Sequence, residues 1–249
     1  MRRVLRLTDG PTTHEELGIS RSADSEPGRE GFLTRSCRFL HADRAVDRDR
    51  VLEQIGHEVA AGSNRDRFEP RPGSHNLGAM ETSDILIEAF GRVVEDFERA
   101  LIGLTADELA YRPDAEANSI AWLAWHAARV QDDHIAELAG RDQAWHDSGF
   151  EDRFDFGFDT RDVGYGHTSD QVATVRTDGP EILLEYLRAV TDRTNHHLSG
   201  IDSAELDRIV DRNWDPPVTA GVRIVSVVDD CIQHAGQAAY VRGLIERRT

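Results

Sequence analysis

The sequence contains no lysine, so all 29 of its basic side chains are arginine. Its two cysteines, Cys37 and Cys231, form no CxxC motif, which excludes a disulfide scaffold and suits a reducing compartment. No apolar run approaches the roughly 18–20 residues of a membrane span, and the basic start is followed by polar residues rather than the apolar core of a signal peptide. We therefore expect a cytoplasmic protein with no membrane partner.

Acidic residues outnumber arginines only in the part of the chain after residue 79. The 29 arginines stand against 46 acidic residues, and the net charge is −17. Residues 1–79 carry 13 arginines and 13 acids, whereas residues 80–249 carry 16 arginines and 33 acids, so the whole excess lies after residue 79. This balance argues against a nucleic-acid partner and admits a neutral or cationic small molecule more easily than a nucleotide.

The chain changes character near Met80. Residues 1–79 hold only short apolar runs, such as Phe39-Leu40, and bury too little apolar surface to offset the entropy of ordering. We predict a poorly ordered extension there, or a start codon assigned too far upstream, with one short helix over 43–61; a regulatory or docking tail is the alternative. The folded domain is predicted over residues 80–249.

Four amphipathic stretches follow Met80, each with apolar residues at steps of three and four. Ser119 is a good N-cap and Gly140 a good helix stop for the second stretch, and Pro180 suits the first turn of the third. We expect helices over 83–104, 119–140, 180–198 and from 221 almost to the end of the chain. The predicted fold is all-α, an up-and-down antiparallel four-helix bundle.

The link from Arg141 to Gly179 is long and rich in phenylalanine. Long connections in compact domains are usually functional or cover another part of the molecule. We expect its rings to pack as a satellite cluster beside the bundle; a lid over one end of the bundle is the alternative. The stretch 214–218, WDPPV, predicts a rigid turn or a short hairpin before the last helix.

Two polar residues interrupt the apolar stripe of the last helix. Asp230 and His234 are four residues apart, so their side chains project from one face about 6 Å apart at Cβ, as two ligands of one metal ion require. His126, beside the stripe of the second helix, is the best placed third ligand. Two histidines and a carboxylate with an open position form a catalytic zinc site, and nickel or iron would fit as well. Alternatively, Asp230 pairs with an arginine or holds His234 by a hydrogen bond.

The other histidines have simpler interpretations. His134 lies about 12 Å along the helix from His126 and cannot bind the same ion. His196 and His197 fall near the end of the third helix, where a cation favours the helix dipole. His167, in the link, is a weaker candidate for an additional ligand that approaches from above. The other side chain close to the proposed ligands, Cys231, is most simply a small buried hydrophobe.

Two segments carry a family resemblance. The stretches NSIAWLAWH, ending at His126, and DCIQHAGQ, beginning at Asp230 and continuing as AAYVR, resemble the two signature segments of the DinB-like superfamily. More narrowly they resemble its mycothiol transferase branch, related to mycothiol-dependent maleylpyruvate isomerase. The resemblance covers roughly residues 80–247 and implies a four-helix bundle with a metal held at His126, Asp230 and His234. Asp230 departs from the family pattern, because it is one methylene shorter than the usual glutamate.

The resemblance implies a metal-dependent thiol S-transferase. A zinc-bound low-molecular-weight thiol, mycothiol by resemblance, would attack a small electrophile. No general base is needed, because the cation stabilises the thiolate and so lowers the pKa of the thiol. One alternative is a zinc-dependent hydrolase with Asp133 as the nearby carboxylate. Another is a non-catalytic bundle that binds metal or a small molecule, or a dimerisation module. The expected partners are the electrophile and the thiol, and a homodimer is compatible with the sequence.

Overall fold

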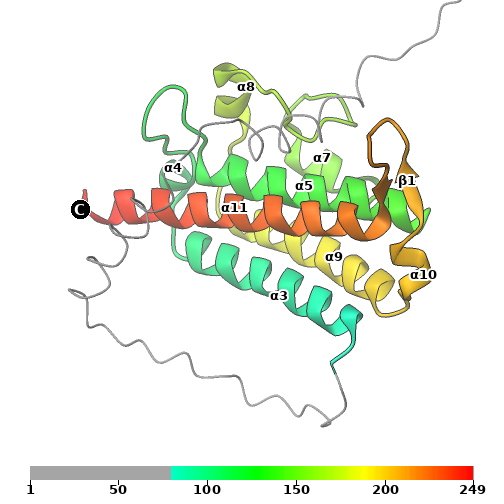
Figure 1. Cartoon of the computed structure of the whole chain (residues 1–249). Helices are drawn as coiled ribbons and strands as arrows, with labels where there is room; N and C mark the ends of the chain where they lie inside the picture. The colour runs from blue at the N-terminus through cyan, green and yellow to red at the C-terminus, as the bar shows by residue number, and fades with distance from the viewer. Residues whose placement is uncertain (1–79, 249) are drawn as a thin grey trace, which may run out of the picture. The chain divides into compact units, whose positions relative to one another are not determined.

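The computed structural model describes residues 80–248, so the predictions for residues 1–79, including the helix over 43–61, lie outside the described residues. Four long helices dominate, which confirms the all-α bundle (Figure 1). They are α3 (Thr82–Leu101), α5 (Ile120–Ala139), α9 (Glu181–Leu198) and α11 (Ala220–Glu246). None of the described helices combines the length and the apolarity that a bilayer crossing requires.

Shorter elements lie in the links. They are α4 (Ala106–Leu109), α6 (Ala144–Asp147), α7 (Phe150–Phe154), α8 (Ser169–Thr174), α10 (Ser203–Leu206), β1 (Ile209–Asp211) and β2 (Val218–Thr219). The two strands pair antiparallel, which confirms a hairpin around the 214–218 turn. The hairpin ends where α11 begins, and the Thr219 hydroxyl caps that helix by accepting a hydrogen bond from the Val222 amide.

Local chemistry sets the ends of α5. The Ser119 hydroxyl accepts a hydrogen bond from the Trp122 amide at 3.1 Å, and Gly140 ends the helix in the left-handed conformation at φ 62°. Both ends agree with the sequence prediction. Pro180 lies one residue earlier than predicted, at the N-cap of α9 rather than in its first turn.

The helices are connected in an order that differs from a simple up-and-down bundle. Both α3 and α5 pack against α9 and α11, so α3 and α5 face each other across the bundle. Figure 1 shows that α3 runs in the same direction as α11, and α5 in the same direction as α9. The order is therefore up, down, down, up. The long link after α5 makes this possible, because it returns the chain along the bundle to the end where α5 began.

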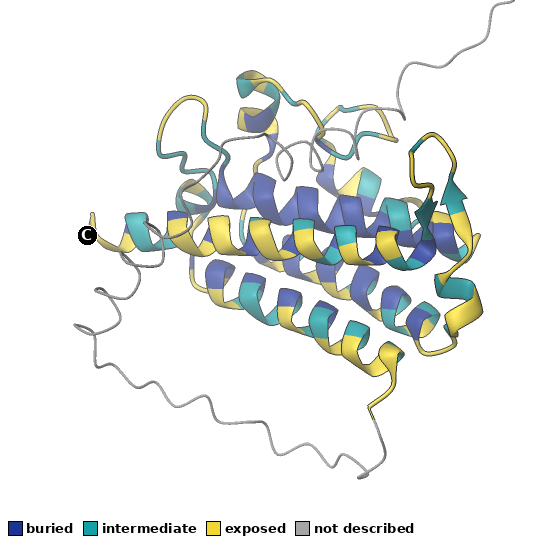
Figure 2. Cartoon of the chain, in the orientation of Figure 1, coloured by how far each residue is buried: buried dark blue, intermediate teal, exposed yellow. Residues whose placement is uncertain are grey.

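The helix α5 is buried on nearly all sides (Figure 2), although the sequence predicted a single buried stripe. Its outward side chains, including Trp125 and Arg129, are covered by the α5–α9 link. The rings of Phe150 and Phe154 in this link pack against Tyr186 of α9, with centroids 4.7 and 5.8 Å away. These rings form the predicted satellite cluster beside the bundle, and they do not form a lid over its end.

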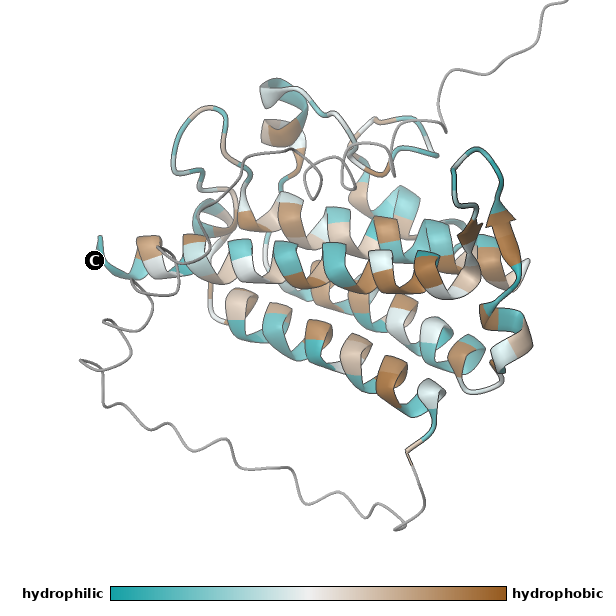
Figure 3. Ribbon diagram, viewed as in Figure 1, coloured by the Kyte–Doolittle hydropathy of each residue, from teal (hydrophilic) through white to brown (hydrophobic). Residues whose placement is uncertain are grey.

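The outer helix α3 keeps a conventional amphipathic pattern (Figure 3). Its residues Phe90, Val93 and Phe97 are fully buried, as the sequence predicted, while its outer face carries charged side chains such as Glu88 and Arg92. Burial of each large apolar side chain contributes about 1.5–3 kcal/mol to the free energy of folding. The buried core therefore lies between the four helices and continues under the α5–α9 link.

Candidate metal site

The three predicted ligands meet between α5 and α11, which are adjacent and antiparallel. His126 lies in the second turn of α5, and Asp230 and His234 lie one turn apart on α11. One potential ligand atom from each residue lies within 4.8 Å of the other two. The imidazole centroids of His126 and His234 are 4.9 Å apart, with their planes at 74°. The structure therefore brings together the residues that helical spacing singled out.

His126 is held in one orientation. Its side chain is buried, and its Nδ1 is hydrogen-bonded to the Val163 carbonyl of the α5–α9 link. A carbonyl only accepts, so Nδ1 carries the proton and Nε2 keeps the lone pair that a metal requires. The Trp122 indole stacks on the same imidazole, with centroids 4.5 Å apart and planes at 15°.

Asp230 and His234 form the α11 half of the site. Nδ1 of His234 donates a hydrogen bond to Oε1 of Gln237 at 2.8 Å, and its Nε2 faces Oδ1 of Asp230 at 3.6 Å. Oδ2 of Asp230 is buried and has no hydrogen-bond partner among residues 80–248. A buried carboxylate oxygen without a donor is costly. A cation between the three side chains would satisfy it.

The electrostatics of the site also suit a cation. Burial, with the nearby charge of His234, lowers the pKa of His126 to about 4, so this imidazole is neutral at pH 7. Burial opposes ionisation of Asp230, but pairing with His234 outweighs it and lowers the pKa of the carboxyl. Burial also opposes protonation of His234, but pairing with Asp230 outweighs it and raises the pKa of that imidazole. Metal binding would therefore compete with protonation of His234.

The donor set fits a divalent ion. Ligand atoms about 2.0–2.1 Å from a tetrahedral zinc ion lie roughly 3.3 Å from each other. The observed separation of up to 4.8 Å is wider, so the side chains would have to close on the ion by about 1.5 Å, a distance within reach of small χ rotations.

Two other candidate residues have different partners. Nδ1 of His167 accepts a hydrogen bond from the Trp122 indole at 3.1 Å, and its Nε2 donates one to Asp162 at 3.0 Å. Both nitrogens are therefore engaged, and His167 is not placed as an additional ligand. Asp133, the carboxylate of the hydrolase alternative, accepts a hydrogen bond from Gln143 at 2.8 Å.

The remaining residues near the ligands have structural environments. His134 contacts Arg223 of α11 at 3.3 Å, in a different layer of the bundle from His126. Cys231 is fully buried, which raises the pKa of its thiol, and the thiol lies 3.6 Å from the Ala127 carbonyl. It is the small buried side chain that the sequence predicted. His196 and His197 lie in the last turn of α9, as expected.

One element of the site was not predicted. The Asp162–His167 turn, residues 162–167 of the α5–α9 link, lies directly against α5. A Cβ atom on Gly164 would lie 2.9 Å from Cζ3 of Trp125 and 3.0 Å from Nδ1 of His126, so only glycine allows this approach. The sequence GYG at 164–166 marks a turn, but residues without periodicity do not show where a turn packs.

A cavity of about 380 Å³ lies beside this turn. Its walls include the aromatic rings of Trp125, Trp145, Phe156 and Phe158, and the carboxylates of Glu151, Asp152, Asp155, Asp159 and Asp162. No arginine or histidine is among its lining residues in the described chain. Its volume is suited to a small molecule.

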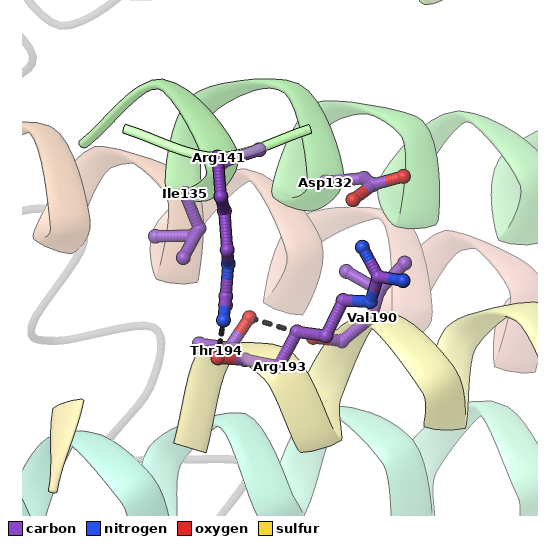
Figure 4. A pocket seen from close by; sticks show the side chains of 7 residues that line it. Asp132, Ile135, Arg141, Val190, Arg193 and Thr194 are labelled. Carbon is purple, nitrogen blue, oxygen red and sulfur yellow. Dashed lines mark hydrogen bonds between the residues drawn. The ribbon is translucent and has the colours of Figure 1, made fainter. Parts of the chain in front are cut away.

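A second pocket, between the C-terminal ends of α5 and α9, has no room for a water-sized molecule (Figure 4). Arg141 crosses it and donates a hydrogen bond to the Arg193 carbonyl, and the Thr194 hydroxyl donates one to the Val190 carbonyl at 2.9 Å. This pocket is part of the helix packing.

Comparisons with known proteins bear on the fold and on the family of the chain. A crystal structure of a conserved protein from Enterococcus faecalis is 35% identical in sequence, covers 66% of this chain and 96% of its own, and superimposes with a TM-score of 0.62. No curated protein shows a significant match to the chain. The family model for mycothiol-S-transferase matches residues 85–247, well over half of the chain. This match confirms both the family resemblance and the prediction of a transferase: the chain belongs to the mycothiol-S-transferase family.

Proposed function

We propose that the chain is a metal-dependent thiol S-transferase whose metal, zinc, is bound by His126, Asp230 and His234. The observation that carries the proposal is the convergence of these three donors from two neighbouring helices around a buried, unsatisfied oxygen of Asp230. The family match supports mycothiol as the thiol. We place the activity in the cytoplasm, as the sequence predicts.

The chain's own residues would prepare the site. The Val163 carbonyl fixes the tautomer of His126, and Gln237 fixes that of His234, so both Nε2 atoms are available as ligands. Asp230 supplies the one negative charge of the donor set. A divalent ion held there would lower the pKa of a thiol that reaches its open position, which supplies a thiolate for attack on the electrophile. No carboxylate is needed as a base, and the engagement of Asp133 with Gln143 weakens the hydrolase alternative.

The cavity beside the Asp162–His167 turn is lined by Trp125 of α5 and by the α5–α9 link but by none of the three proposed ligands, and we take it as the candidate binding site for the electrophile. Its carboxylates repel anions, and its aromatic walls favour apolar or cationic groups. We infer that the electrophile is a small neutral or cationic compound. A panel of neutral, cationic and anionic electrophiles of similar size would test this, and preferential turnover of the anionic compounds would contradict it.

The proposed function is tested by metal content and thiol transfer together. We expect protein purified without added metal to contain close to one zinc ion per chain, and to conjugate mycothiol to an electrophile faster than glutathione or cysteine. His234→Gln should lose both properties. Asp229→Asn is the matched control, because Asp229 is the adjacent exposed aspartate of α11 and pairs only with Gln233 in the described chain. Stoichiometric metal without transfer to any thiol would support the non-catalytic alternative, and transfer that survives chelation would exclude a metal mechanism.

A further inference from the structure

One carboxylate closes the Asp162–His167 turn. Oδ1 of Asp162 accepts a hydrogen bond from the Gly164 amide at 2.7 Å, and Oδ2 accepts one from Nε2 of His167 at 3.0 Å. The Asp162 main-chain carbonyl accepts a third from Nε of Arg129, a fully buried residue of α5, at 3.2 Å. Asp162 therefore makes hydrogen bonds both within the turn and to α5.

The turn is also connected to the candidate metal site through Trp122. An indole N–H can only donate, so Nδ1 of His167 must accept from it, and Nε2 of His167 must carry the proton that Asp162 accepts. The direction of each hydrogen bond from Trp122 to Asp162 is thereby fixed. The Trp122 ring stacks on His126 and lies edge-on to His234, with centroids 6.1 Å apart and planes at 89°.

A second connection runs through the backbone of the turn. The Val163 carbonyl follows Asp162 directly and accepts the Nδ1 proton of His126. Gly164, at φ 89°, lets the backbone approach the imidazole this closely. A turn that moved outward would break the hydrogen bond to His126 and would loosen the stacked Trp122 ring as well.

We propose that Asp162 is a positioning residue for the metal site. Its carboxylate holds the turn so that Val163 sets the tautomer of His126 and Trp122 sets the plane of its ring. Asp162 itself is not placed among the three ligands. The inference rests on the proposed metal-dependent function, because it assigns a role toward the metal that His126, Asp230 and His234 would hold.

The chemistry of the turn explains why an uncharged replacement should fail. Asparagine has one acceptor oxygen where Asp162 has two, so its amide nitrogen would face either Gly164 N–H or His167 Nε2–H. His167 cannot change tautomer to relieve this contact, because its Nδ1 must still accept from Trp122. One hydrogen bond of the turn is therefore lost and replaced by a donor–donor contact.

The first test is zinc affinity. We expect zinc, titrated into metal-free protein, to bind Asp162→Asn about 10–100-fold more weakly than the wild type, which is the usual effect of removing a group that orients a ligand. The matched control is Asp159→Asn, an aspartate of the same link whose side chain pairs with the exposed Arg161. The zinc affinity of Asp159→Asn should be within about twofold of that of the wild type, because Asp159 does not orient a proposed ligand.

Trp122→Phe tests the same connection from its other end. Phenylalanine keeps an aromatic ring for stacking on His126 but has no N–H for His167. If Asp162 acts through this chain of hydrogen bonds, the loss of zinc affinity in the double variant should be smaller than the product of the two single losses. Strictly independent effects would contradict the route through Trp122. If Asp162→Asn does not fold, the zinc affinity of Trp122→Phe alone still tests this route.

A metal-free measurement separates this inference from the proposed function. In nitrogen NMR spectra of the metal-free protein, we expect His126 to be protonated at Nδ1 in the wild type and to populate both tautomers in Asp162→Asn. Wild-type zinc affinity together with an unchanged His126 tautomer in that variant would overturn the inference. A wild type that binds no divalent metal would overturn the proposed function instead, and the His126 tautomer would still decide whether Asp162 positions the ring.

Discussion

Asp230 supplies the only carboxylate among the three donors, and its environment is specialised. Its Oδ1 faces His234, while its Oδ2 is buried and has no hydrogen-bond partner within the described chain. Because pairing with His234 keeps the pKa of Asp230 below its usual value despite burial, the carboxylate is ionised at neutral pH before any ion arrives. The site is thus prepared electrostatically, although a glutamate would reach farther toward a metal.

We predict that Asp230→Asn lowers zinc affinity by one to three orders of magnitude, roughly 1.4–4 kcal/mol of binding free energy, because it removes the anionic ligand and keeps the shape. Asp230→Glu should bind zinc as tightly as the wild type or more tightly, since the longer side chain closes part of the gap between donors. Calorimetric zinc titration of the three metal-free proteins measures both effects. Equal affinity in Asp230→Asn would make Asp230 a structural residue.

A second prediction concerns pH. The pKa of His126 is about 4 in the folded protein, against about 6.5 in an unfolded chain. Between these values the unfolded chain takes up a proton that the folded chain does not, so the contribution of this group to stability is complete above about pH 6.5 and is lost as the pH falls toward 4. The loss amounts to roughly 3 kcal/mol.

Urea unfolding of the metal-free protein at pH 7 and pH 4.5 measures this loss. His126→Asn is the reference, because other buried histidines also contribute to the pH dependence of the wild type, and the pKa of His134 is lowered as well by burial. We expect the wild type to lose more stability than the variant over this range. Identical losses would show that His126 is not protected from protonation.

Among the elements, the start of α6 is hydrogen-bonded to one buried side chain of α5. Asp132 is buried and accepts hydrogen bonds from the Ala144 and Trp145 amides at 2.9 and 2.8 Å, at the start of α6, and from the Tyr186 hydroxyl of α9 at 2.9 Å. These bonds fasten the α5–α9 link where it leaves α5. Arg129, in the same network, lies over the Trp145 ring at 4.7 Å.

We predict that Asp132→Ala destabilises the domain by about 3 kcal/mol, because it leaves two backbone amides and one hydroxyl buried without acceptors. Tyr186→Phe should cost less, about 2 kcal/mol, since it removes two hydrogen bonds, one to Asp132 and one from Arg129, and keeps the ring. Urea unfolding gives both values. Limited proteolysis should also show faster cleavage within residues 141–179 of Asp132→Ala, and unchanged cleavage there would mean that Asp132 does not anchor the link.

The elements also show why some features could be predicted and others could not. Ser119, Gly140 and the four-residue spacing of Asp230 and His234 are local signals, so the ends of α5 and the proximity of these two side chains followed directly from the sequence. The proposed role of Asp162 depends on where an irregular turn packs, and the spacing of residues in the sequence does not predict this. Burial of α5 on its second face was missed for the same reason, because the covering segment is the non-periodic link.

At the scale of the whole molecule, helical periodicity identifies which face of each helix is buried, but not which helices pack against each other. The stripes predicted the four helices, but the packing of α5 beside α11, which brings His126 close to Asp230, is seen only in the structure. The up, down, down, up order was not predicted. It follows from the path of the α5–α9 link, whose residues pack along α5 instead of taking a short route to an adjacent antiparallel helix.

We predict that residues 80–249 fold without residues 1–79. Within residues 80–248, the helices enclose a continuous hydrophobic core, and the sequence of residues 1–79 offers only short apolar runs, so we expect removal of the leading segment to leave the burial that stabilises the domain largely unchanged. Thermal unfolding of Met80–Thr249 and of the full chain should give transitions within a few degrees of each other. An insoluble fragment, or a much lower transition, would show that residues 1–79 contribute to the core.

The burial of Cys231 has a consequence if the chain acts on an electrophile, as we propose. Residues 80–248 contain no lysine amine, and their single thiol is fully enclosed, with its pKa raised by burial. Because the thiolate is the reactive form of cysteine, an alkylating substrate meets neither of the two side chains that such reagents most readily modify. Under the proposed function, we therefore expect residues 80–248 to resist alkylation by the electrophile, so that the incoming thiol is the nucleophile that reacts.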